Sequence, residues 1–469
     1  MKKISIYSLV AFTLLIFVGG CESDFLDVNQ NPNDPTEVET EYLVAAAEGA
    51  LAYYMGFEVN RDASLICQQW SSIYTQYWDV DKYRLLPTDF DNHWSNFYGQ
   101  TLSDLNAAIK LSEQRNSPNI KAVCMLLQAY TYQAITDMWG DAPFSQAMQI
   151  DEYITPAYDN VSDIYPALLS MIDDAIDLME GEEEPTLLLQ DVIYNGDLTK
   201  WKAFAQTLKL RLMMRMSNTD EFTSSDLTAL IAEGGFIESN NGNAIFTYGT
   251  TTNNYNPLFE RFTSAGRSND LAPSSTIVDL MNDTNDPRRT NYFELASGTT
   301  EYIGNPNGYG AITTENLSRL PSWWYDRNDQ AGMSRPTLLM TSSEAYFLLA
   351  EAAARGFSSG DVNDLYNQAV TQSMLQWEVP EEDISTFLSN NSYVDLDGLY
   401  VQKYISLYDQ GLEAYSEWRR SGLPVLAVAA NSQNGDRIPV RFPYPYDEFS
   451  TNSDNVPDDD INTPIWWDR

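Results

Sequence analysis

Residues 341–377 read Thr341-Ser-Ser-Glu-Ala-Tyr-Phe-Leu-Leu-Ala-Glu-Ala-Ala-Ala-Arg-Gly356-Phe-Ser-Ser-Gly360-Asp361-Val-Asn-Asp-Leu-Tyr-Asn-Gln-Ala-Val-Thr-Gln-Ser-Met-Leu-Gln-Trp377. Thr341 and Glu344 have the spacing of a capping box, which predicts a helix from there to Arg355. Residues 356–360 are typical of a short turn, and Asp361 predicts the cap of a second helix. The stretch therefore predicts a helical hairpin about as long as a tetratricopeptide repeat.

Helical periodicity also extends outward from this hairpin. It predicts one helix over about 119–139, ended by Gly140, and another over roughly 163–180, with Pro166 in or near its first turn. Irregular regions over about 78–92 and 236–340 separate the helical segments, and short strands are predicted within the second, for example around 244–248. The sequence thus predicts a mainly α fold, an α-helical bundle with tetratricopeptide-like hairpins plus long loop-rich insertions and few short strands.

The N-terminus has the pattern of a lipoprotein signal peptide over residues 1–20. A basic start is followed by a short apolar run and by Val18-Gly19-Gly20-Cys21, where small residues allow cleavage and the thiol takes the lipid. The alternative is an ordinary cleaved signal with a chance cysteine at its end. Residues 21–37 are rich in turn formers and predict a flexible tether. No later stretch is apolar enough to span a bilayer, so we expect a lipid-anchored protein.

Composition excludes several classes of function. Lys and Arg total 27 against 67 Asp and Glu, a net charge of −40, which excludes nucleic-acid binding and indicates a solvated acidic surface. His93 is the one histidine, so a histidine zinc site is not expected and a Ser-His-Asp triad would depend on it. The acidic run 454–460 lacks the spacing of an EF-hand loop. No metal and no cofactor are therefore predicted. Cys67 and Cys124 either pair or remain buried thiols.

Seven segments in order resemble the SusD/RagB family of nutrient-binding outer-membrane lipoproteins. They are Cys21-Glu-Ser-Asp-Phe-Leu-Asp27 with Asn31-Pro-Asn-Asp-Pro-Thr36, Tyr132-Gln-Ala-Ile-Thr-Asp-Met-Trp-Gly-Asp-Ala-Pro-Phe144, Trp201-Lys-Ala-Phe-Ala-Gln-Thr-Leu-Lys-Leu-Arg-Leu212, Asp286-Pro-Arg288, Ser343-Glu-Ala-Tyr-Phe-Leu-Leu-Ala-Glu-Ala352, Glu417-Trp-Arg-Arg-Ser-Gly-Leu-Pro424 and Ile438-Pro-Val-Arg-Phe-Pro-Tyr-Pro445. Each segment alone is weak, but their order across nearly the whole chain is specific.

The resemblance implies a single helical domain over residues 38–469, with four tetratricopeptide-like hairpins and a loop-rich ligand region at about 236–340. It implies a lipid-anchored protein on the cell surface, which acts as the lid of a SusC-like TonB-dependent β-barrel transporter. Ligands in the family are usually oligosaccharides and sometimes peptides. The residues Glu22, Ser23 and Asp24 resemble the family's surface-export signal.

Sugar binding needs flat apolar rings with polar groups at their edges. Aromatic residues in polar stretches, with one arginine as a polar edge group, are therefore the candidate ligand residues. They are Trp78, Tyr83, Trp94, Tyr255, Trp323, Trp324, Tyr325 and Arg327. The helical spacing of Trp70, Tyr74 and Tyr77 favours a core stripe instead. The group Trp323-Trp-Tyr325 has two alternative roles, fixing its loop to the scaffold or contacting the transporter.

Four functions are compatible with the sequence. The leading hypothesis is non-enzymatic binding of an oligosaccharide and its delivery to the transporter. The alternative within the binding class is a peptide-binding lid of the RagB type. A secreted glycoside hydrolase on a helical scaffold and a pure scaffold protein are the other two. The negative charge favours a cationic or neutral ligand over an anionic one.

Overall fold

The hairpin predicted over residues 342–377 is present in a computed structural model of the chain, as α15 (Ser342–Ala354) and α16 (Val362–Gln376). The structure describes residues 39–181, 190–264, 266–267, 270–310 and 316–468. The Thr341 hydroxyl accepts the N–H of Glu344 at 3.3 Å, and the Asp361 carboxylate accepts that of Asp364 at 3.1 Å. Both predicted helix starts are therefore confirmed. The capping box is only half formed, because both carboxylate oxygens of Glu344 accept hydrogen bonds from Arg211.

The mainly α fold is confirmed by the other helices of the described residues. They are α2 (Thr40–Gly56), α3 (Glu58–Ile66), α4 (Trp78–Asp81), α5 (Asp91–Asn96), α6 (Ser103–Arg115), α7 (Pro118–Trp139), α8 (Val161–Met179), α9 (Leu198–Arg215), α10 (Ser224–Glu233), α11 (Pro257–Ser264), α12 (Ser275–Asp283), α13 (Arg289–Tyr292), α14 (Gln330–Met333), α17 (Glu381–Asn390), α18 (Leu396–Ser406), α19 (Gly411–Ser421) and α20 (Tyr446–Thr451).

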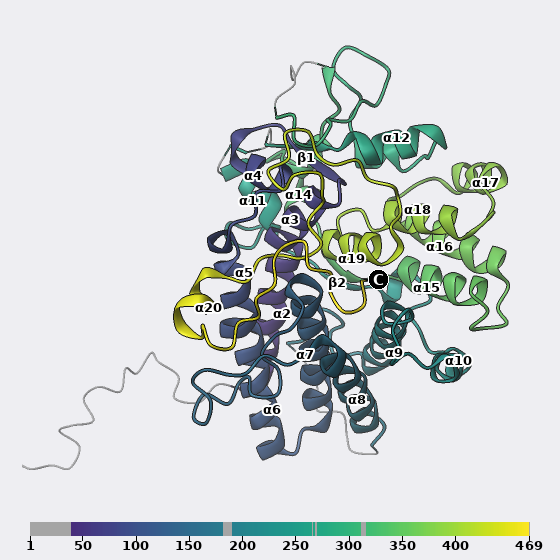
Figure 1. Cartoon of the computed structure of the whole chain (residues 1–469). Helices are drawn as coiled ribbons and strands as arrows, with labels where there is room; N and C mark the ends of the chain where they lie inside the picture. Colours follow the sequence, from purple (N-terminus) through teal and green to yellow (C-terminus); the bar gives the residue numbers. More distant parts are fainter. Residues whose placement is uncertain (1–38, 182–189, 265, 268–269, 311–315, 469) are drawn as a thin grey trace, which may run out of the picture. The chain divides into compact units, whose positions relative to one another are not determined.

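Helices that follow one another in the chain pack as hairpins. The pairs α6–α7, α7–α8, α8–α9 and α15–α16 are all in contact, and Figure 1 shows α6 to α8 together at the bottom of the view and α15 to α18 on its right. The predicted helix over 119–139 is confirmed as α7. The predicted helix over 163–180 is confirmed as α8, but it begins at Val161, so that Pro166 lies inside it. The apolar stripe of α8 is buried as predicted: Ile164, Leu168, Ile172, Ala175 and Met179.

The region 236–340 contains more regular structure than the sequence predicts, because α11 to α14 lie within it. Two short antiparallel strand pairs hold this region: one joins it to residues 70–72, and the other joins its own two ends. Strand β1 (Trp70–Ser72) pairs with β3 (Leu271–Pro273), and β2 (Ala244–Phe246) pairs with β4 (Thr337–Met340). The predicted strand around 244–248 is thus confirmed. The predicted core positions of Trp70 and Tyr77 are confirmed, because both side chains are buried. The predicted helical stripe is wrong, because Trp70 lies in β1 and Tyr74 is exposed.

Several predictions concern residues outside the described part of the chain. The signal peptide, the lipidated Cys21 and the tether over 21–37 all lie there. Within the described residues, no helix has both the length and the hydropathy that a membrane span requires. Cys67 and Cys124 are both free and buried, which corresponds to the second of the two alternatives for these thiols.

A network of buried ion pairs joins the central helices. Arg211 on α9 lies 2.6 Å from Glu344 on α15. Arg420 on α19 lies 2.5 Å from Glu351 on α15, and Lys403 on α18 lies 2.8 Å from Glu417 on α19. Burial raises the pKa of Glu417, but Arg420 and Lys403 outweigh that effect and hold the pKa well below its ordinary value. The network therefore fixes α9, α15, α18 and α19 relative to one another.

Replacing Arg420 with Met should destabilise the protein strongly, because it leaves Glu351 and Glu417 buried without that guanidinium. We expect the free energy of unfolding, measured by urea denaturation, to fall by about 3–5 kcal/mol. Lys121→Met is the matched control, since Lys121 pairs with Glu113 at 2.7 Å on the surface and its loss should cost less than about 1 kcal/mol. Equal losses in the two variants would contradict a structural role for the buried network.

Candidate ligand-binding site

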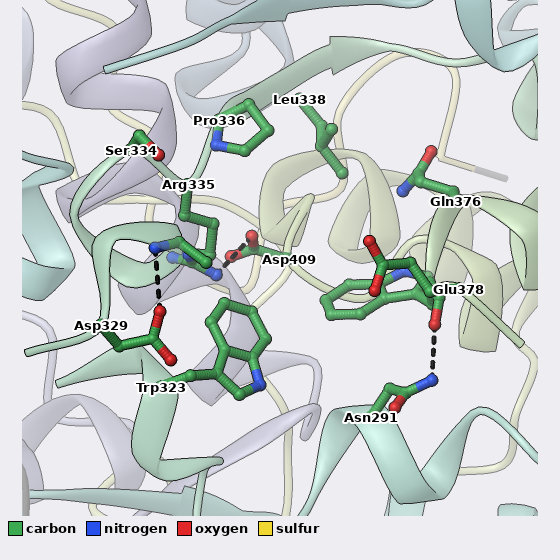
Figure 2. A pocket seen from close by; sticks show the side chains of 12 residues that line it. Asn291, Trp323, Asp329, Ser334, Arg335, Pro336, Leu338, Gln376, Glu378 and Asp409 are labelled. Carbon is green, nitrogen blue, oxygen red and sulfur yellow. Dashed lines mark hydrogen bonds and ion pairs between the residues drawn. The ribbon is translucent and has the colours of Figure 1, made fainter. Parts of the chain in front are cut away.

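A cavity of about 500 Å³ lies beside the short 3₁₀ turn η7 (Ser322–Trp324), in the loop-rich region. This volume is in the usual range for small-molecule sites. Figure 2 shows the cavity with its aromatic, charged and amide side chains. The residues that line it are Asn291, Trp323, Asp329, Ala331, Ser334, Arg335, Pro336, Leu338, Gln376, Trp377, Glu378 and Asp409.

Separate segments of the chain bring these side chains together. Trp323 lies on η7 and Arg335 comes just before β4. Trp377 follows α16, and Asp409 lies in the loop between α18 and α19. The position of η7 depends on Gly332, because a Cβ added to this residue would lie 1.8 Å from the carbonyl oxygen of Trp323. A glycine is therefore required where α14 packs against the turn.

Two half-buried tryptophans give the cavity flat apolar surfaces. The Trp377 ring packs edge-on against Tyr292, with ring centroids 4.5 Å apart, and Tyr292 stacks on Tyr408 at 4.3 Å. The Trp323 ring lies 5.7 Å from that of Trp324, which is itself buried. Each half-buried indole is thus supported from behind by buried aromatic rings, an arrangement that suits the packing of sugar C–H faces.

An ion pair forms the polar part of the cavity wall. Nη1 of Arg335 donates to Oδ2 of Asp409 at 2.7 Å, and the other oxygen of Asp409 accepts from Asn60 at 2.7 Å. The guanidinium carbon of Arg335 lies 3.7 Å from the centroid of the Trp324 ring. Burial raises the pKa of Asp409, and Arg335 opposes the rise. Among the described residues the guanidinium donates to no other acceptor, so its Nε and Nη2 keep their donor capacity.

The backbone at the cavity is held in an uncommon conformation at two positions. Glu378 has φ of 57° and Asp409 has φ of 71°, a left-handed region that non-glycine residues seldom adopt. Asn291 holds the first of these turns, because its Nδ2 donates to the carbonyl oxygen of Trp377 at 2.5 Å. Such strain persists where surrounding contacts impose it, and it is frequent at ligand sites.

The predicted ligand residues at positions 255 and 323–327 have different environments in the structure. Trp323 lines the cavity, whereas Trp324 is 1% exposed and lies beneath Arg335. Tyr325 is half-buried outside the lining, and Arg327 is exposed and donates to the carbonyl oxygen of Thr263 at 2.5 Å. Tyr255 packs against the ring of Phe259. Only Trp323 of this predicted group therefore faces the cavity.

The predicted residues of the 78–94 region lie away from the cavity lining. Trp78 is half-buried, and the Lys82 ammonium lies 4.5 Å from its ring centroid. Tyr83 is 1% exposed, and its hydroxyl accepts from Gln68. Trp94 is 7% exposed and packs edge-on against Trp139. Tyr83 and Trp94 thus contribute to the core, and their predicted contact with ligand would require that core to open.

Sequence reasoning missed Arg335, Trp377 and Asp409. The sequence held one indication for Trp377. An aromatic residue that ends a predicted helix and is followed by Glu-Val-Pro lies at the start of a turn, outside the helix core. Arg335 and Asp409 carried none, because their pairing joins residues 74 positions apart in the chain.

Asp81 anchors a loop beside Trp78. Its two carboxylate oxygens accept hydrogen bonds from Nδ2 of Asn307 and from the N–H of Gly308, both at 2.7 Å. Burial raises the pKa of Asp81 to about 7 in spite of these donors. The folded protein therefore binds more protons than the unfolded chain between about pH 4 and 7. The contribution of Asp81 to stability is fully present below about pH 4 and is lost as the pH rises through about 7.

Replacing Asp81 with Asn should remove this pH dependence. We expect the wild-type free energy of unfolding to lose up to about 4 kcal/mol through this group between about pH 4 and 7, and the variant to lack that slope. The variant will be less stable at low pH, because the NH₂ group of the new asparagine faces one of the two donors, Asn307 or Gly308, and cannot accept its hydrogen bond. Urea denaturation at several pH values measures both effects. If the free energy of unfolding changed equally with pH in the two proteins, Asp81 would not be the group responsible.

Comparisons with known proteins agree with this fold. A sequence model of a SusD-like family, described as "Starch-binding associating with outer membrane", matches residues 32–445. A chitin-binding protein of known structure is 24% identical, with a TM-score of 0.80 over 92% of this chain and 100% of its own. A SusD homologue from Bacteroides uniformis is 24% identical, with a TM-score of 0.76 over 91% of this chain and 99% of its own.

A chitin-binding SusD homologue from Flavobacterium johnsoniae is 22% identical, with a TM-score of 0.77 over 92% of this chain and 98% of its own. At these identities the structural likeness establishes the fold. No curated protein matches the chain significantly.

Proposed function

Because the chain belongs to the SusD-like family, we propose that it binds a nutrient oligosaccharide in the cavity beside Trp323. The observation that carries the proposal is the pairing of two supported indoles, Trp323 and Trp377, with the buried Arg335–Asp409 ion pair in one cavity. The chitin-binding proteins of the same fold support an oligosaccharide as ligand.

The chemistry of the lining matches the two surfaces of a sugar. The C–H faces of a pyranose ring pack on indole rings, and its hydroxyls accept from Arg335 or exchange hydrogen bonds with the amides of Asn291 and Gln376. The cavity is large enough for a few sugar rings at most, so a longer oligosaccharide would extend beyond it.

We propose that binding occurs without chemical change to the ligand. His93 is 1% exposed and its Nε2 lies 3.2 Å from Asp62 inside the core, away from the cavity lining, which argues against a histidine general base at the cavity. Hydrolysis of a glycan would instead use a pair of carboxylates, and the search for shortened glycans described below tests that chemistry.

The proposed setting is the outer face of the outer membrane. Lipidation at Cys21 would anchor the chain, and residues 21–37 would form the tether that lets the body move over a SusC-like TonB-dependent transporter as its lid. The acidic Glu22 and Asp24 after the anchor support export to the surface. A peptide remains the alternative ligand, and the binding panel for Trp323 includes it.

Trp323→Ala should weaken binding of the cognate oligosaccharide about 30-fold, because a stacked aromatic anchor contributes about 2 kcal/mol. Titration calorimetry against starch, N-acetylglucosamine oligomers and peptides identifies the ligand. Tyr446→Ala, an exposed ring on α20, is the control and should bind normally. Unchanged binding by Trp323→Ala, or shortened glycans after incubation with the wild type, would refute the proposal.

The transporter partner is tested in native outer membranes. Affinity capture of the full chain should copurify one large TonB-dependent β-barrel. A Cys21→Ser variant should leave the membrane fraction and recover much less of the barrel, because it lacks the lipid that holds the two proteins in one membrane. Capture of the wild type without a barrel would count against the lid role.

A further inference from the structure

We infer that the cavity beside Trp323 selects its ligand by charge, favouring amine-bearing oligosaccharides over neutral ones and excluding acidic ones, and that Asp329 and Glu378 make this selection. The inference rests on the proposed function, since it names the class of ligand for the same site. It goes beyond that function because an oligosaccharide site needs no charge preference.

The charged groups of the lining do not balance. The only cation among the lining residues is Arg335, and its charge is matched by Asp409 at 2.7 Å. Asp329 and Glu378 remain, and neither carboxylate forms an ion pair with any of the described residues. The lining therefore holds two carboxyl groups that no cation among the described residues matches.

Both carboxylates are positioned by local structure. Asp329 caps α14, where its Oδ1 accepts the N–H of Ala331 at 2.9 Å. Glu378 is held at the turn after α16, with φ of 57°. Figure 2 shows Asp329 and Glu378 on opposite sides of the cavity. A ligand bound between the two indoles would consequently have a carboxylate on either side.

The paired cation does not offset this preference. Arg335 is 7% exposed, and its charge is satisfied by Asp409, so its remaining N–H groups act as hydrogen-bond donors to neutral hydroxyls. The rest of the chain adds to the negative field, because its net charge is −40. An ammonium group would gain attraction to Asp329 or Glu378, whereas a uronate would be repelled by both.

The test compares three six-sugar ligands by titration calorimetry with the full chain. They are N-acetylglucosamine oligomers, which are neutral, glucosamine oligomers, which are cationic, and galacturonate oligomers, which are anionic. A pH of about 5.5 keeps exposed carboxylates ionised while the amines are largely protonated. We expect the anionic ligand to bind at least about tenfold more weakly than the neutral one, and the cationic ligand about threefold more tightly.

The decisive comparison uses the double variant Asp329→Asn/Glu378→Gln. The amide oxygen that the first substitution introduces can still accept from Ala331, so the variant removes charge and keeps the cap. We expect both affinity ratios to approach one. Asp174→Asn, which removes an exposed carboxylate on α8, should leave the ratios unchanged. Raising the ionic strength from about 0.02 to 0.5 M should reduce the wild-type ratios, because salt screens exposed charges.

The outcomes separate this inference from the function on which it rests. Wild-type ratios that persist in the double variant, or an anionic ligand that binds the wild type as well as the neutral one, would overturn charge selection while leaving oligosaccharide binding intact. Failure of the wild type to bind any of the three ligands or the other glycans of the panel would overturn both.

Discussion

The rest of the structure depends on burying cations with their carboxylate partners at the junction of α9, α15, α18 and α19. A buried charge is tolerated only with a partner in good geometry, so each pair fixes the relative position of two helices. The pairs of α19 are the most consequential. Glu417 meets Lys403 of α18, and Arg420 meets Glu351 of α15. The loop between α18 and α19 carries Asp409, so the same constraint places the ion pair of the cavity wall.

Features that depend on contacts between residues close together in the sequence were predicted correctly. The starts of α15 and α16 followed from Thr341 and Asp361, since a helix cap is a contact within four residues. Local spacing predicted the helix start near Glu344 but not the partner of its carboxylate. Its spacing from Thr341 indicated a capping box, but its carboxylate pairs with Arg211, which is 133 residues away. Sequence periodicity contains no information on such a partner. The short helices of 236–340 were missed for a related reason, because they are stabilised by tertiary contacts more than by propensity.

The residues of the candidate site were also only partly predictable from the sequence. Trp323 was predictable, because consecutive aromatics in a polar insertion cannot all be buried on one helix stripe. Its neighbour Trp324 lies in the same run of aromatic residues but is buried, with the guanidinium of Arg335 packed on its ring. The sequence does not distinguish the two tryptophans, because this contact is a tertiary one. Trp377, Arg335 and Asp409 come from three separate segments that long-range pairing brings to one cavity. The resemblance of the chain to a known family located the ligand region, and the tertiary structure was needed to identify the residues that line it.

The buried network also affects the surface charge. Eight of the 27 Lys and Arg residues are buried in the described part of the chain, against twelve of the 67 Asp and Glu. A larger share of the cations than of the carboxylates is thus buried, so acidic groups outnumber basic ones outside the buried core by a larger ratio than composition alone indicates. Arg335 is one of these cations, held by Asp409 at the cavity wall. Because the pairing that stabilises the fold also satisfies the one cation among the lining residues, the stability of the cavity and its negative charge have a common physical origin.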